Sequence, residues 1–246
     1  MKLSIQEISI TIAAKGLSPS ILNPDFLKYS DIVPSDWQYE KEPVFASNGA
    51  HIAYTNGIRI TAQPNRVSFA QAFATKEHSK FQINTIAANF LEKLPGADYQ
   101  AVGINPRGIV PFLENEHEAY EFLFQKLFSV GSWQKFGQAP VQAAVQLGYV
   151  LDQGNLNLAI NEAKLNAKDQ ASGSAVVFSG NFNYPVLGDA KVKRLQSIKE
   201  RIELWQTSVT TFQQLINEHF LGVPNESSLD NSIPVAPPAL DREMVL

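Results

Sequence analysis

Apolar and polar residues alternate in several short segments of the chain, which is typical of β-strands that bury one face. In the segment 8–12, three isoleucines alternate with Ser9 and Thr11. Comparable strand patterns occupy residues 43–54, 58–62, 67–73, 101–104, 141–151, 156–160 and 175–182. The dipeptide Asn56-Gly57 separates two of these segments and suits the two left-handed positions of a type I′ hairpin turn. We therefore predict antiparallel strands joined by tight turns.

Apolar residues that recur every three or four positions predict two longer helices. The first covers residues 83–94 and ends at Pro95-Gly96. The second covers residues 189–221, and at 1.5 Å per residue it would be about 50 Å long. That length suggests either that the helix spans both halves of the chain, which we expect, or that part of it pairs with another chain.

The order of these elements repeats within the chain. The sequence RVSFAQAF at residues 66–73 is matched by AVVFSGNF at residues 175–182. Both halves place a tryptophan 11 residues after a phenylalanine that lies in a predicted short helix, at Trp37 and Trp133. Several spacings that match in the same order favour a duplication. The alternative is that α+β domains often reuse the same order of proline, strand and turn.

We therefore predict an α+β protein with tandem duplicated β-α-β-β-β-α units, whose antiparallel sheets are covered by helices. The first unit would be residues 1–96 and the second residues 97–222, including the long helix. Residues 223–246, VPNESSLDNSIPVAPPALDREMVL, are rich in proline, serine and aspartate. This composition predicts a disordered C-terminal tail, whose short apolar groups could dock on a partner as an extended peptide.

Composition indicates a globular protein with a weakly charged surface. Charged residues make up 18% of the chain, against about 25% in typical soluble domains. The net charge is −4 and the 20 basic residues are scattered, which argues against nucleic-acid binding. Glu7 interrupts the apolar N-terminal segment, so it does not resemble a signal peptide. Because the chain has no cysteine and no long apolar run, we expect a cytoplasmic protein without membrane insertion.

Uncharged amides and hydroxyls occupy the positions between core residues in the second half. A solvated sheet face normally carries more lysine and glutamate, which also discourage pairing between sheet edges. Such a face could bind another protein, a sugar or a second copy of the chain, although an ordinary solvated face is an equally simple interpretation. The candidate interaction residues are Gln142, Gln146, Asn155, Asn157, Asn161, Ser179, Asn181 and Asn183.

Motifs for catalysis and metal binding are incomplete. The segment 103–110 begins like a phosphate-binding loop but has Ile109-Val110 where lysine and serine or threonine are needed. His117-Glu118 begins like a metalloprotease helix and lacks the second histidine. We name no catalytic residue, cofactor or metal ligand.

Two basic residues precede glycines at matching places in the two halves, Lys15 and Arg107. They are candidate anion contacts, or they mark two equivalent strand ends, which is the simpler interpretation.

The segments NGIRITAQPNRVSF, residues 56–69, and YQAVGINPRG, residues 99–108, resemble an uncharacterised family of conserved bacterial proteins. Members have a turn glycine, a strand with an arginine shortly before an aromatic residue, and a later strand with Ile-Asn. The resemblance implies no activity and no site residues.

The sequence favours a non-catalytic protein-protein interaction or scaffold protein, with a protein partner or self-association. An enzyme or small-ligand-binding protein with a site between the two halves is the alternative. A nucleic-acid-binding module is a second alternative, because duplicated α+β units also form TATA-binding proteins and sliding clamps, although this is an analogy of fold alone.

Overall fold

A computed structural model of the chain describes residues 1–73, 81–112, 117–129, 131–167, 173–223 and 242–245. The strands are β1 (Ser4–Lys15), β2 (Val44–Ala46), β3 (Gly49–Ala53), β4 (Ile58–Gln63), β5 (Arg66–Ala72), β6 (Asp98–Phe112), β7 (Ala144–Leu151), β8 (Gly154–Ala167), β9 (Gly173–Pro185) and β10 (Arg242–Val245). The helices are α1 (Pro24–Tyr29), α2 (Ile83–Lys93), α3 (Glu118–Lys126), α4 (Lys191–Ile202) and α5 (Trp205–Gln214), with single turns η1 (Pro19–Ile21), η2 (Ser132–Lys135) and η3 (Leu215–Phe220).

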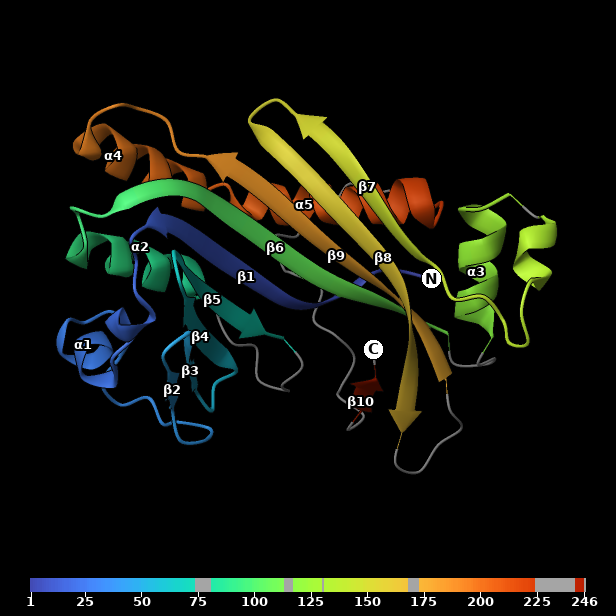
Figure 1. Cartoon of the computed structure of the whole chain (residues 1–246), viewed down its shortest axis with the longest axis horizontal. Coiled ribbons are helices and arrows are strands. Elements are labelled where there is room, and N and C mark those ends of the chain that lie inside the picture. Colours follow the sequence, from blue (N-terminus) through green and yellow to red (C-terminus); the bar gives the residue numbers. More distant parts are fainter. Residues whose placement is uncertain (74–80, 113–116, 130, 168–172, 224–241, 246) are drawn as a thin grey trace.

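The strands form one antiparallel sheet in the order β10-β8-β9-β6-β1-β5-β4-β3-β2, and β7 also pairs with β8. The two central strands, β1 and β6, pair with each other in the middle. The first half of the chain, residues 1–96, extends the sheet on one side of this pair, and the second half, residues 97–223, extends it on the other (Figure 1). The prediction of an α+β protein with antiparallel strands is confirmed.

One face of the sheet forms the core. A row of apolar side chains crosses its centre, and Phe69, Ile10, Ile104 and Phe182 lie opposite one another on four neighbouring strands. All four are buried, and burial of each such side chain stabilises the fold by about 1.5–3 kcal/mol. This burial explains why the alternating pattern of the sequence folds as a sheet with one apolar face.

The helices cover this apolar face. Phe90 of α2 packs edge-on against Phe69, and Phe220 of η3 packs against Phe178 of β9. The backbone N–H of Ala119 in α3 donates a hydrogen bond to Ser174 Oγ on the same side of β9. In Figure 1, α4 and α5 lie behind the strands, so the opposite face of the sheet is turned toward the viewer. That opposite face carries no helix in the described part of the chain.

The two halves have matching strand orders, but a tandem duplication is not shown. Matching Lys15 with Arg107 aligns Ile10 with Val102, and matching RVSFAQAF with AVVFSGNF aligns Phe69 with Phe178. Ile10 lies opposite Phe69, but Phe178 lies opposite Gly108 and not opposite Val102. This alignment therefore does not reproduce the same strand register in both halves. The two halves also share one continuous sheet rather than forming two sheets.

Two details of the first hairpins differ from the prediction. The predicted strand 43–54 is divided into β2 and β3, which pair with each other around a turn at residues 47–48. The turn at Asn56-Gly57 is not type I′, because only Gly57 has a positive φ, of 82°. The Asn56 side chain accepts a hydrogen bond from the backbone N–H of Ile58 at 3.1 Å, and asparagine commonly shapes turns by bonding to the backbone two residues on.

The interpretation of Lys15 and Arg107 as equivalent strand ends is wrong. Gly16 does end β1, with a left-handed φ of 78°. Strand β6, however, continues through Arg107 and Gly108 to Phe112. Gly108 is needed for packing there, because a Cβ at this position would lie 2.8 Å from the Leu3 side chain.

The long C-terminal helix is interrupted. Residues 203–204 separate α4 from α5, whereas the sequence predicted one helix over residues 189–221. The interruption allows two shorter helices to follow a sheet that twists, which a single straight helix could not do. Lys199 of α4 forms an ion pair with Glu92 of α2 at 3.0 Å, and Arg194 pairs with Asp98 of β6 at 2.9 Å. The helical segment thus contacts both halves, as expected.

Most of the predicted disordered tail, residues 223–246, lies outside the described residues. Residues 242–245 are described as β10, which pairs with residues 164–167 of β8. No described helix combines the length and the apolar character that crossing a membrane requires.

Candidate functional site

The open face of the sheet gathers most of the predicted interaction residues. Over residues 155–160 of β8 and 178–184 of β9, every second side chain is buried and the others are directed to the open face. Asn155 lies opposite Asn183, and Asn157 lies opposite Asn181. The residues brought together on this face are Gln146, Asn155, Asn157, Asn161, Ser179, Asn181 and Asn183. Gln142 is exposed but precedes β7 and so lies outside the sheet.

Four polar residues of the central strands extend this surface, and the sequence interpretation missed them. Asn105 of β6 donates hydrogen bonds to Ser9 Oγ at 3.1 Å and to Thr11 Oγ1 at 3.3 Å, both on β1. Thr11 in turn shares a hydrogen bond of 3.0 Å with Ser68 of β5. Asn181 donates to Asn105 Oδ1, which joins this network to β9. The alternation of Ser9 and Thr11 with isoleucines in the sequence could have identified these two residues as members of the open face.

We call these eleven residues, seven from the prediction and four from the central strands, the amide face. Its central members satisfy one another by cross-strand hydrogen bonds, each of which contributes about 0.5–1.5 kcal/mol to stability. Asn155, Asn157 and Asn183 are exposed, and none of the hydrogen bonds of the described residues involves their side chains. These three amides are therefore free to bind a partner. The face ends where Ala175 and Val177 become buried.

Charged residues are few on the open face. Arg59 of β4 forms an ion pair with Glu7 of β1, and both side chains are partly exposed. Arg107 lies opposite Glu7 on one side and Ser179 on the other. Its Nε atom is buried and has no hydrogen-bond partner. Arg107 therefore provides a positive charge near the centre of the amide face that forms no ion pair within the described residues, while the Glu7 opposite it is paired with Arg59.

The two candidate anion contacts, Lys15 and Arg107, are not brought together. Lys15 lies opposite Asp98 at one end of β1, and Arg107 lies opposite Glu7. Eight residues of extended strand separate Glu7 from Lys15, which corresponds to about 26 Å. One small anion cannot contact both side chains.

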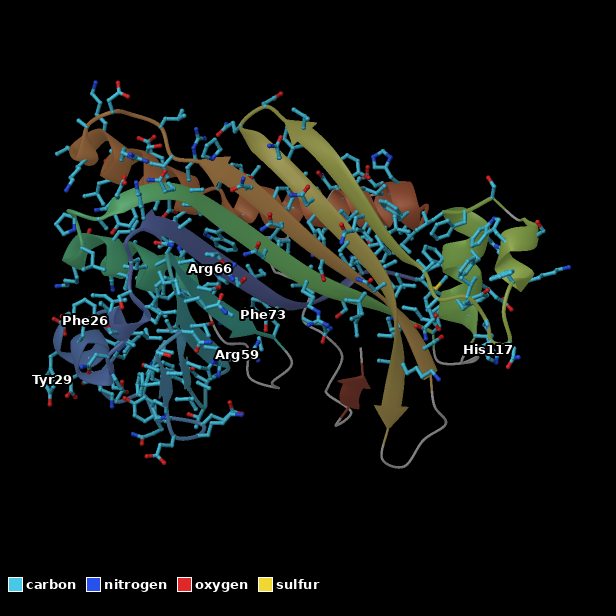
Figure 2. The ribbon with its side chains drawn as sticks, in the orientation of Figure 1. Phe26, Tyr29, Arg59, Arg66, Phe73 and His117 are labelled. Carbon is cyan, nitrogen blue, oxygen red and sulfur yellow. The ribbon has the colours of Figure 1, made fainter. Side chains whose placement is uncertain are left out.

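The histidines that the structure describes belong to separate parts of the fold. His117 lies near one end of the molecule, well away from Arg59 and Arg66 (Figure 2), and His78 lies outside the described residues. The described part of the chain contains no group of histidine, aspartate and glutamate residues able to hold a metal ion.

Three tyrosines have altered acidity for structural reasons. Burial raises the pKa of the Tyr99 hydroxyl, which donates a hydrogen bond to the Leu94 carbonyl at 2.8 Å. Burial also raises the pKa of Tyr149, and burial together with the nearby Tyr39 raises that of Tyr54. All three belong to the apolar core or pack against it, away from the amide face. Tyr99 reaches the core side because an irregularity in the pairing of β1 with β6 shifts the alternation there.

A cleft of about 480 Å³ lies between the segment after α1 and helix α2. Its walls come from residues 31–35 and 81–89, so this cleft lies within the first half and not between the halves. Gln82, Thr85 and Asn89 supply polar groups, and Phe81 and Ile86 supply apolar ones. Phe81 also stacks on Trp205 of α5, with ring centres 3.8 Å apart.

Comparison with known proteins gives no match to any family model, curated protein or solved structure. The amide face and the cleft must therefore be interpreted from their own chemistry.

Proposed function

We propose that this protein is a non-catalytic interaction or scaffold protein that binds a protein partner through the amide face. One observation carries the proposal. The helices that contact the sheet cover its apolar face, and the exposed middle of the other face bears neutral hydrogen-bonding side chains rather than lysines and glutamates. Unsatisfied amides on a broad, rigid sheet can form hydrogen bonds with a partner without the cost of burying many charges.

The chemistry of the face favours protein over the other ligand classes. Nucleic-acid binding depends mainly on neutralised phosphates and requires several cationic side chains. On this face Arg59 is already paired with Glu7, Arg107 remains near the centre, and Arg66 is exposed at the start of β5. These cations are too few and too scattered to follow a phosphate backbone. Small ligands bind mostly in concave sites, whereas the amide face follows the surface of a sheet. Arg107 would donate hydrogen bonds to a carboxylate or a backbone carbonyl of the partner.

Affinity capture tests the proposal. Wild-type protein and the variant Asn155→Lys/Asn157→Lys are immobilised and exposed to an extract of the native source. The matched control is Gln206→Lys/Thr210→Lys, which adds the same charge at exposed positions of α5. We expect a specific protein to bind wild type and the control but not the face variant. Equal capture by all three would contradict the proposal.

The same experiment distinguishes a protein partner from a nucleic-acid partner. Added lysines on the amide face would strengthen binding to phosphates and make it more sensitive to salt. Recovery of more DNA or RNA by the face variant than by wild type would therefore indicate that the partner is a nucleic acid and not a protein.

The cleft beside α2 favours small-ligand binding as a second candidate function. A volume of about 480 Å³ with both polar and apolar walls falls within the range of sites for small molecules. Native mass spectrometry of protein purified gently from its source would detect a bound molecule. Replacement of Thr85 by tryptophan should fill the cleft and remove the added mass, while Asn155→Lys/Asn157→Lys should retain it.

We also propose that the two halves descend from one duplicated unit, with an alignment different from the sequence match. Ile10 lies opposite Phe69 and Ile104 lies opposite Phe182, so aligning these two pairs preserves the register of the central strands. Superposition of the halves in an experimental structure should then place β5 on β9 and β4 on β8. Failure of these strands to coincide would contradict a duplication.

A further inference from the structure

Strand β7 forms an uncovered edge of the sheet. In the described part of the chain it pairs with β8 along its whole length and has no strand on its other side, as Figure 1 shows. Ala144, Gln146, Gly148 and Val150 are exposed, and Val150 has 90% of its surface open to solvent. An edge of this kind presents backbone N–H and C=O groups that can pair with another strand.

The sequence of β7 lacks the usual protection of an edge. Its eight residues, AVQLGYVL, include no charged residue and no proline, the two most common devices against edge pairing. The strand at the opposite edge of the sheet, β2, contains only three residues, and very short edge strands are a recognised protection. The edge formed by β7 thus lacks these protections, whereas the opposite edge of the sheet is protected by its short strand.

The hairpin geometry identifies the outward backbone groups. Leu151 and Gly154 flank a two-residue turn and lie opposite each other, so they form a hydrogen-bonded pair. Because hydrogen-bonded and outward positions alternate along an antiparallel strand, Val150, Gly148 and Gln146 direct their N–H and C=O groups away from β8. Pairing at this edge would therefore leave the bonds to β8 intact.

We propose that β7 pairs antiparallel with β7 of a second copy of this chain, around a two-fold axis at Leu147. Across the axis Gln146 would lie opposite Gly148, Ala144 opposite Val150, and Val145 opposite Tyr149. Each of these pairs joins a smaller residue with a larger one, and no like charges meet. The half-buried side chains of Val145, Leu147 and Tyr149 would cover their counterparts on the helix side of the sheet, which favours association.

This inference goes beyond the proposed function, because it assigns self-association to the edge and not to the amide face. Pairing of one short strand buries less than the roughly 1,200 Å² of a standard stable interface, so we expect a dimer that dissociates on dilution. Dimerisation would join two sheets and place two amide faces side by side. A partner could then bind two copies at once, with higher avidity.

Sedimentation velocity of the full chain over a series of concentrations tests the inference. We expect wild type to shift from 27.2 kDa toward twice that mass as the concentration rises. The variant Gln146→Lys/Val150→Lys should remain monomeric, because lysines of the two copies would lie diagonally across the axis. The control Asn155→Lys/Asn157→Lys alters the neighbouring strand β8 and should dimerise like wild type.

Hydrogen exchange provides a second measurement that does not depend on a variant. The outward amides of Gln146, Gly148 and Val150 should exchange more slowly at high protein concentration, while exposed amides elsewhere should not change. A wild type that stays monomeric at all concentrations would overturn the inference, and this is the result expected if a peptide of another protein occupies the edge. A dimer that persists in Gln146→Lys/Val150→Lys would overturn it too. Loss of dimerisation leaves the proposed function standing, because capture through the amide face is tested with a different variant.

Discussion

Tyr184 of β9 and Ser208 of α5 share a hydrogen bond of 2.8 Å in the core, which connects the sheet to the helix that covers it. Ser208 also donates to the Leu204 carbonyl at 2.8 Å. Because a serine hydroxyl carries one proton, Tyr184 must be the donor in the bond to Ser208. Both residues are buried, so water cannot easily replace either partner.

We expect Ser208→Ala to lower the free energy of unfolding by about 1–3 kcal/mol, because the Tyr184 hydroxyl would remain buried without an acceptor. Urea unfolding monitored by circular dichroism measures this change. The double variant Tyr184→Phe/Ser208→Ala removes both hydroxyls and should recover part of the loss. A double variant that is less stable than Ser208→Ala alone would show that the unpaired hydroxyl is not the cause.

Gly180 of β9 should be sensitive to the addition of one methyl group. A Cβ at this position would lie 2.9 Å from the ring of Phe212, which is fully buried on α5. We expect Gly180→Ala to lower the free energy of unfolding by about 1–3 kcal/mol through overpacking. Gly103→Ala is the control, because the nearest atoms there lie 3.5 Å from the added Cβ. Equal effects of the two substitutions would contradict the contact between β9 and α5.

Tyr99 makes stability depend on alkaline pH. Burial raises the pKa of its hydroxyl in the folded protein, while in the unfolded chain it ionises near pH 10. The contribution of Tyr99 to the free energy of unfolding is complete below about pH 10. It is lost as the pH rises toward the pKa of the folded state, because the tyrosine of the unfolded state releases its proton first. We expect the urea midpoint to fall above pH 10, and to fall less steeply in Tyr99→Phe. Identical pH dependence in the two proteins would contradict this account.

Local periodicity explains what the sequence predicted well. The alternation in β1, β8 and β9 indicated buried and open positions residue by residue, because side chains of a strand point to opposite faces in turn. The same alternation placed Asn157 and Asn181 on one face before their strands were known to pair. Helix α2 was predicted because its apolar residues keep helical spacing until Pro95-Gly96.

The remaining features depend on contacts between distant residues. The bonds of Asn105 to Ser9 and Thr11 require the pairing of β6 with β1, which no local pattern reveals. The course of β6 past Arg107 depends on Gly108 packing beneath Leu3. The break between α4 and α5 occurs beside Trp205, whose stacking on Phe81 is a tertiary contact. The cytoplasmic location stays a prediction.

Site-specific photo-crosslinking is the most direct test of the central claim, that a protein partner binds the amide face. A benzophenone amino acid replaces Asn157 in one variant and Thr210 of α5 in the other, both at exposed positions. After irradiation in the native extract, we predict a single covalent adduct of one protein from position 157 and none from position 210. An adduct from position 210 with none from 157 would contradict the claim and place the partner on the helix side.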